Sequence, residues 1–115
     1  MRYSILLLFT VACTSEEGVK AHNSAPTALI TSHPDGAEIA EGVSVQLLGQ
    51  VSDANHLSSE LSVKWSTNLR TLCEGEAPDV DGATICTASF EAGDTQLRLQ
   101  ATDPEGEAVV VTHNI

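Results

Sequence analysis

The chain has 115 residues, enough for one small domain, and 5 basic against 16 acidic side chains give a formal net charge of -11. This balance argues against a nucleic-acid partner, because phosphate binding needs clustered lysine and arginine. The hydrophobic content of 42% supports a small core and argues against wholesale disorder, and the aromatic content of 3% argues against a carbohydrate-stacking surface.

The first twelve residues have the pattern of a secretory leader. Arg2 supplies a positive charge, residues 5–11 form an apolar run, and the small residue Ala12 precedes Cys13. The run is shorter than the ~20 apolar residues that cross a bilayer. The pattern therefore predicts a cleaved signal peptide over residues 1–12. An ordinary signal peptide without acylation, or a buried apolar strand, is the alternative.

The junction at residues 11–13 resembles the lipobox of bacterial lipoproteins, in which a small residue is followed at once by cysteine. The resemblance implies that Cys13 is diacylated on sulfur and becomes the new N-terminus. It also implies outer-membrane sorting, because Thr14 rather than aspartate follows the cysteine. Two or three acyl chains hold a protein stably on a membrane. The polar residues 13–25 predict a flexible tether between this anchor and the domain.

The cysteine count supports the same interpretation. There are three cysteines, and an odd number in an exported protein needs an explanation. Lipidation of Cys13 leaves Cys73 and Cys86, which we expect to form a disulfide in an oxidising compartment. A metal site built on this pair is disfavoured, because no histidine or second cysteine pair stands at ligand spacing.

Residues 26–115 show short β-prone runs between turn signals and no helical period. We expect strands over residues 27–32, 43–51, 61–66, 85–90, 96–102 and 109–113. Gly49 interrupts the second run and predicts a bulge. Two Pro-containing tetrapeptides, at residues 33–36 and 103–106, predict type I turns. The pattern predicts a single antiparallel β-sandwich, with Trp65 in its core.

Five short motifs follow one another along residues 23–106, and their order carries a resemblance to a known group of domains. They are Asn-Ser-Ala-Pro at residues 23–26, Glu-Gly at 41–42, Val-Ser-Asp at 51–53, Leu-x-Val-x-Trp-Ser at 61–66 and Leu-x-Leu-x-Ala-Thr-Asp-x-x-Gly at 97–106. Together they resemble the PKD-like and cadherin-like immunoglobulin-fold modules of bacterial envelope proteins. The resemblance implies an immunoglobulin-like β-sandwich that acts as a spacer or adhesion unit.

No motif in the sequence predicts catalysis. The chain lacks a nucleophile elbow, a zinc-protease helix motif and a phosphate-binding loop. The four histidines are His22, His33, His56 and His113, and they stand in no recognisable constellation. We expect each of them to be a solvated surface group, so the sequence favours a protein that is not an enzyme.

Calcium is the candidate ligand that the sequence suggests. In an immunoglobulin-like topology, the segments after the second strand and before the last strand lie at the same end. Asp53 and Asn55 follow the second strand, Asp103 and Glu105 precede the last one, and Asn23 enters at that end too. A hard cation that takes six to eight oxygens suits such a set. The alternative is that Asp53 and Asp103 accept backbone hydrogen bonds and cap turns.

These observations predict an exported, lipid-anchored cell-envelope protein, sorted to the outer membrane, whose domain is structural or binds a protein partner in the envelope. Two alternatives stay open. The first is a calcium-dependent adhesion module that uses the loop oxygens named above. The second is an enzyme-associated subunit or inhibitor that binds its partner through the acidic segment 74–82. No cofactor other than calcium is suggested.

Overall fold

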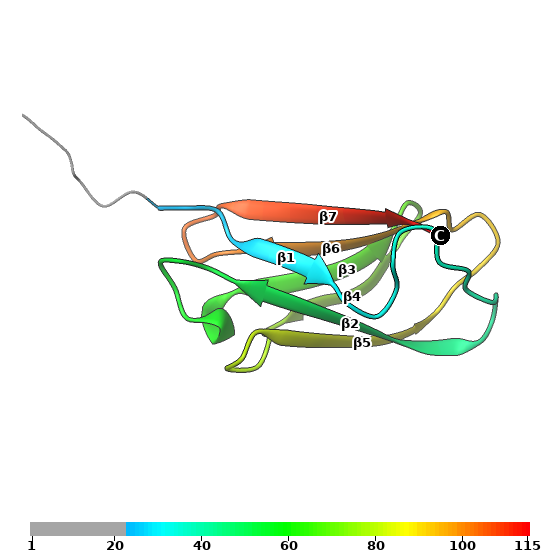
Figure 1. The fold of residues 1–115 in the computed structure, drawn as a ribbon, viewed down its shortest axis with the longest axis horizontal. Coiled ribbons are helices and arrows are strands. Elements are labelled where there is room, and N and C mark those ends of the chain that lie inside the picture. The colour runs from blue at the N-terminus through cyan, green and yellow to red at the C-terminus, as the bar shows by residue number, and fades with distance from the viewer. Residues whose placement is uncertain (1–22) are drawn as a thin grey trace, which may run out of the picture.

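The computed structural model describes residues 23–115, so the predicted leader and Cys13 lie outside the described residues. In the described part, two antiparallel sheets pack face to face as a β-sandwich (Figure 1). The strands are β1 (Thr27–Ile30), β2 (Ser44–Ser52), β3 (Ser62–Thr67), β4 (Thr71–Glu76), β5 (Ala83–Ser89), β6 (Gln96–Thr102) and β7 (Ala108–Asn114), with a 3-10 turn, η1 (Ser58–Glu60). The predicted all-β, immunoglobulin-like sandwich is confirmed.

One sheet contains three strands and the other contains four. One sheet has the order β1-β2-β5 and the other β4-β3-β6-β7. In an immunoglobulin constant domain, the fourth strand joins the sheet of the first two strands. Here β4 pairs with β3 instead, which places β4 and β5 at the edges of different sheets.

Alternation along the strands builds the core between the sheets. Leu47 and Val51 of β2 and Leu97 and Leu99 of β6 are buried, and the residues between them in each strand are more exposed. Successive side chains of a strand point to opposite faces, so each sheet has one apolar face. The buried hydrophobic residues are Ile30, Leu47, Val51, Leu61, Val63, Trp65, Cys86, Phe90, Leu97, Leu99 and Ala101. The predicted core position of Trp65 is confirmed.

A disulfide closes one side of the sandwich. Cys73 of β4 and Cys86 of β5 are bonded, with their Cα atoms 6.1 Å apart. The two strands belong to different sheets, so this bond links the sheets covalently at their edges. The pairing predicted from the cysteine count is confirmed.

Two details of the strands differ from the sequence prediction. The pairing of β2 with β5 runs without a break through Gly49, so the predicted bulge at this residue is wrong. Irregularities occur instead in the pairing of β3 with β4. The strand β4 itself was not predicted, because its sequence is acidic, contains Gly75 and lacks an alternating apolar face.

The two predicted proline turns have different outcomes. The amide of Gly106 donates to the carbonyl of Asp103 at 3.0 Å, which confirms the turn over residues 103–106. The other turn lies one residue later than predicted, since the amide of Ala37 donates to the carbonyl of Pro34. Gly36, with φ of 89°, then occupies the third position, where a positive φ favours glycine.

The loops that connect the strands lie at the two ends of the sandwich. Figure 1 shows that β1 begins, β2 and β6 end and β7 begins at the end where the chain enters, whereas the C-terminus lies at the other end. The β2–β3 connection and the β6–β7 turn therefore lie beside the entering residues, as the sequence predicts for the segments that carry Asp53 and Asp103.

Candidate functional site

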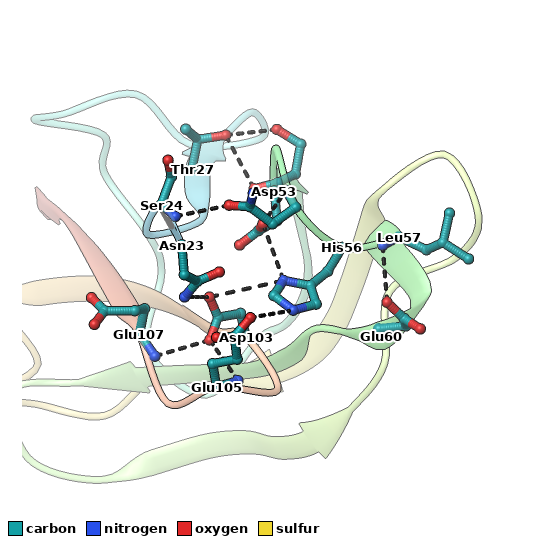
Figure 2. Close-up of polar contacts among 12 residues, drawn as sticks. Asn23, Ser24, Thr27, Asp53, His56, Leu57, Glu60, Asp103, Glu105 and Glu107 are labelled. Carbon is teal, nitrogen blue, oxygen red and sulfur yellow. Dashed lines mark hydrogen bonds and ion pairs between the residues drawn. The ribbon is translucent and has the colours of Figure 1, made fainter. Parts of the chain in front are cut away.

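Three segments far apart in the sequence contribute polar side chains to the entry end of the sandwich. Asn23 comes from the entering segment, Asp53 and His56 from the connection after β2, and Asp103 and Glu105 from the turn before β7. These side chains converge in Figure 2. We call this group the entry cluster.

The imidazole of His56 lies at the centre of the entry cluster. Its Nδ1 is 3.2 Å from Oδ1 of Asp53 and 4.0 Å from Oδ2 of Asp103. Its Nε2 is 3.1 Å from Oε2 of Glu105. The ring is mostly buried, with 14% of the side chain exposed, and the side chains of Asp53 and Asp103 are fully buried, at 0% exposed. One imidazole therefore faces three carboxylates.

Each aspartate uses one oxygen to fold its own loop. Asp53 Oδ1 accepts the amide N–H of Asn55 at 2.7 Å. Asp103 Oδ1 accepts the amides of Glu105 and Glu107, each at 2.9 Å. Such side-chain-to-backbone bonds fix turns locally. The turn-capping alternative is thus correct for one oxygen of each carboxylate, and the second oxygen of each remains for other contacts.

The remaining oxygens face the interior of the cluster. Asp103 Oδ2 accepts the carboxamide N–H of Asn23 at 2.9 Å. Asp53 Oδ2 and Asn23 Oδ1 are buried and accept no hydrogen bond within the described residues. Buried polar atoms are nearly always paired in folded proteins, so two unpaired acceptors in one cluster need a physical explanation.

Burial and charge act in opposite directions on His56. Burial lowers the pKa of the imidazole, but the hydrogen bond to Asp53 and the charges of Asp53, Asp103 and Glu105 outweigh it, so the pKa lies above its ordinary value. For Asp103, burial raises the pKa, but the hydrogen bonds from Asn23 and from the amides of Glu107 and Glu105, together with the charge of His56, outweigh it, so the pKa lies below its ordinary value. The cluster thus favours charged states of both groups.

The four residues predicted as calcium ligands do not share one arrangement. Asp53, Asp103 and Glu105 surround His56, whereas Asn55 Oδ1 accepts the amide N–H of Ser24 at 2.8 Å. Asn55 therefore binds Ser24, which lies in the segment 13–25 that the sequence predicts to be a flexible tether. Calcium binding by these residues stays a prediction.

The role of His56 was not predicted from the sequence. The expected solvated surface group is wrong, because the structure places its ring between the buried carboxylates of Asp53 and Asp103. The one available signal was the spacing of Asp53 and His56, three residues apart in a loop. Of the other histidines, His33 and His113 lie near the opposite end, where His113 Nδ1 is 2.7 Å from the carbonyl oxygen of His33. His22 lies outside the described residues.

The acidic segment 74–82 is partly a strand. Its first residues belong to β4, and Asp79 Oδ1 then accepts the amides of Asp81 and Ala83, each at 2.9 Å. Asp79 thus organises the turn before β5.

Comparisons with protein-family models, with characterised proteins and with solved structures find no match to this chain. Within residues 23–115, none of the helical structure has the length and apolar character that a membrane-crossing helix needs.

Proposed function

We propose that the chain is an exported protein, held on the outer membrane by acylated Cys13, whose immunoglobulin-like domain is a non-catalytic structural or binding module. The observation that supports this best is the cysteine arrangement. The bond between Cys73 and Cys86 uses both cysteines of the sandwich. Cys13, the one remaining cysteine of the chain, stands directly after the leader pattern. A structural disulfide is also typical of proteins that reside in an oxidising compartment.

The fold suits display of a small module on a lipid anchor. The chain enters the sandwich at one end, and the C-terminus lies at the other (Figure 1). A domain joined to a membrane through its entry end presents the opposite end away from the bilayer. That exposed end carries loops rather than an apolar spanning segment, and loops are where binding residues concentrate.

Cell fractionation combined with mass spectrometry tests the anchor. The mature protein should lose residues 1–12, should carry acyl chains on Cys13, and should co-sediment with outer membranes. The Cys13→Ser variant should lose the acyl mass and leave the membrane fraction. A matched control is the double variant Cys73→Ala/Cys86→Ala, which should remain membrane-bound if it accumulates. An uncut leader, or a Cys13→Ser variant that fractionates like the parent, would contradict the proposal.

Crosslinking in intact envelopes tests the binding role. A photoreactive residue at the end far from the anchor, for example at Asp35, should capture an envelope protein. The same residue placed at Asp79, at the anchor end, serves as the comparison. Equal recovery from both positions would argue against a binding surface at the far end, and recovery only from Asp79 would favour a partner at the acidic segment 74–82.

A further inference from the structure

The entry cluster contains more acceptor atoms than donors. Asp53 has a fully buried side chain, and its Oδ2 accepts no hydrogen bond. Asn23 Oδ1, which belongs to the residue that enters from the N-terminal side, is a second buried acceptor without a donor. An acceptor removed from water needs a donor or a cation as its partner. Within residues 23–115, no side chain supplies a donor to either atom.

The ring of His56 can offer one nitrogen to a metal ion. Its Nε2 lies 3.1 Å from Glu105 Oε2, the geometry of a ring N–H that donates to a carboxylate. Its Nδ1 lies 3.2 Å from Asp53 Oδ1 and 4.0 Å from Asp103 Oδ2, so the charged ring that the cluster favours also donates its Nδ1–H to Asp53. A metal ion would displace this one proton and take the Nδ1 lone pair, while the Nε2–H stays on Glu105. Histidines that bind metals commonly donate their other ring N–H to a carboxylate in this way.

The charge of the cluster is strongly negative. Asp53, Asp103 and Glu105 lie within 4.0 Å of the His56 ring nitrogens. Among the described residues, the ion pairs of these three carboxylates are all with this ring, and Arg70 pairs elsewhere. Three negative charges thus exceed the single positive charge that an imidazole can carry. The side chains of Asp53 and Asp103 are fully buried, whereas that of Glu105 is 57% exposed. Buried charges are costly unless they are paired, so a divalent cation would balance the two buried carboxylates.

We propose that Asp53, His56 and Asp103, assisted by Asn23, bind one divalent transition-metal ion of the zinc class. Each of the first three residues offers a ligand atom, and these atoms lie within 4.8 Å of one another. Ligand atoms on one zinc ion are about 3.4 Å apart, given metal–ligand distances near 2.1 Å. Metal binding would therefore draw the three side chains closer together than they lie in this structure.

The donor types separate this site from a calcium site. Calcium takes six to eight oxygen ligands and does not favour imidazole nitrogen. Imidazole together with carboxylate suits zinc and its neighbours. Glu105 would orient the His56 ring through Nε2 and would not bind the metal itself. Bound metal would fix the entering segment, through Asn23, to both loops and so would orient the domain relative to whatever precedes it.

Isothermal titration of the purified full-length chain, without a histidine tag and after EDTA treatment, tests the site. ZnCl₂ should bind with one-to-one stoichiometry. Asp53→Asn keeps the oxygen that folds the loop and removes the free one, and we expect it to weaken binding at least 100-fold. His56→Gln should do the same. Glu105→Gln should weaken binding 10–100-fold, as expected for a residue that orients a ligand.

Asp79→Asn is the matched control. It removes one charge from a turn in which the aspartate also accepts two backbone amides, and its zinc affinity should equal that of the parent. Circular dichroism confirms that each variant is folded. If a variant does not fold, ¹⁵N NMR of the parent chain decides, because zinc should shift the ring nitrogens of His56 more than those of His113.

Three results would overturn the inference. The first is that neither ZnCl₂ nor CoCl₂ binds at 1 mM. The second is that Asp53→Asn or His56→Gln binds zinc as tightly as the parent. The third is that calcium binds, and binds equally well in the parent and in His56→Gln, which would restore an oxygen-only calcium site at the same end. None of these results depends on whether Cys13 is acylated.

Discussion

The indole N–H of Trp65 donates to the hydroxyl oxygen of Thr84 at 3.1 Å, inside the core and from one sheet to the other. The two residues lie on β3 and β5 and are separated by 19 positions in the sequence. A buried indole needs a partner for its single donor. This hydrogen bond therefore couples the position of the largest core side chain to the alignment of the sheets.

Thr84→Val should destabilise the domain by about 1–3 kcal/mol, because it keeps the shape of the side chain and leaves the indole N–H unpaired. Urea unfolding followed by circular dichroism measures the change. Thr84→Ser retains the acceptor and should cost less than Thr84→Val. The exposed neighbour Thr87, on the same strand, is the control, and Thr87→Val should change stability by less than about 0.5 kcal/mol. Equal losses for the two valine variants would contradict the role of the hydrogen bond.

Gly49→Ala should destabilise the domain by about 1–3 kcal/mol through overpacking. A Cβ at this position would lie 2.7 Å from Leu99 Cδ2 and 3.0 Å from Trp65 Cζ2, closer than such atoms approach without movement. Replacing Leu99, the nearest contact, with the smaller valine tests whether overpacking is the cause. The double variant Gly49→Ala/Leu99→Val should lose less stability in urea than the sum of the single variants. Additive losses would show that the glycine is required for another reason.

Removal of the disulfide, in the double variant Cys73→Ala/Cys86→Ala, should lower the free energy of unfolding by about 3 kcal/mol, the value expected when a bridge closes a loop of this length. The bonded cysteines are 13 positions apart. Reduction of the parent chain with dithiothreitol should produce a similar loss in a thermal or urea melt. A double variant as stable as the oxidised parent would mean that the strand edges are held mainly by other contacts.

Acid should weaken the domain through Asp94. Burial raises the pKa of this carboxyl, but hydrogen bonds from the Glu91 amide, from Arg70 and from Thr67, together with the Arg70 charge, hold it below 3.8, its ordinary value. Arg70 Nη2 and Asp94 Oδ2 are 2.8 Å apart, and the Asp94 side chain is 1% exposed. The folded state thus binds the proton less readily than the unfolded state. Its stabilising contribution is full above pH 3.8 and is lost as the pH falls through the folded-state pKa.

Asp94→Asn tests this expectation. The variant should be less stable than the parent at pH 7, and the difference should shrink as the pH falls below 3.8, when the parent loses the same interaction. Unfolding free energies between pH 2 and pH 7 provide the measurement. Asp81→Asn, at an exposed position in a turn, is the control and should follow the parent at every pH. A constant difference between Asp94→Asn and the parent across this range would refute the assignment.

The sequence was sufficient to predict an antiparallel β-sandwich and most of its strands, because the alternating pattern of a half-buried strand is local. In β2 and β6, apolar residues alternate with polar ones, and a half-buried strand produces that pattern directly. β4 gives no such signal, because it is a mostly exposed edge strand that is specified by its pairing with β3. The role of Gly49 could not be predicted either, since it depends on Trp65 and Leu99 from the opposite sheet.

The candidate site was predicted only in part, because some of its contacts join residues that are distant in the sequence. The position of Asp53 and Asp103 at one end follows from strand order alone, and the structure brings them together. The insertion of His56 between them depends on the path of a loop, for which the sequence has no periodic pattern. The entry of Asn23 at this end was predicted, but its hydrogen bond to Asp103 and that of Ser24 to Asn55 were not, since a polar run gives no sign of which residues are bound.

Trp65 is the single tryptophan of the chain, and its backbone partner on the neighbouring strand is Cys73, one half of the disulfide. Directly opposed residues of an antiparallel pair point to the same face of the sheet, so the indole and the bridge lie on the same side of this sheet. Because disulfides quench indole emission at short range, we expect the native fluorescence to change when the bridge is reduced or the sheets separate. Trp65, which spans the two sheets through its bond to Thr84, is thus the natural place to follow redox state and folding without an added label.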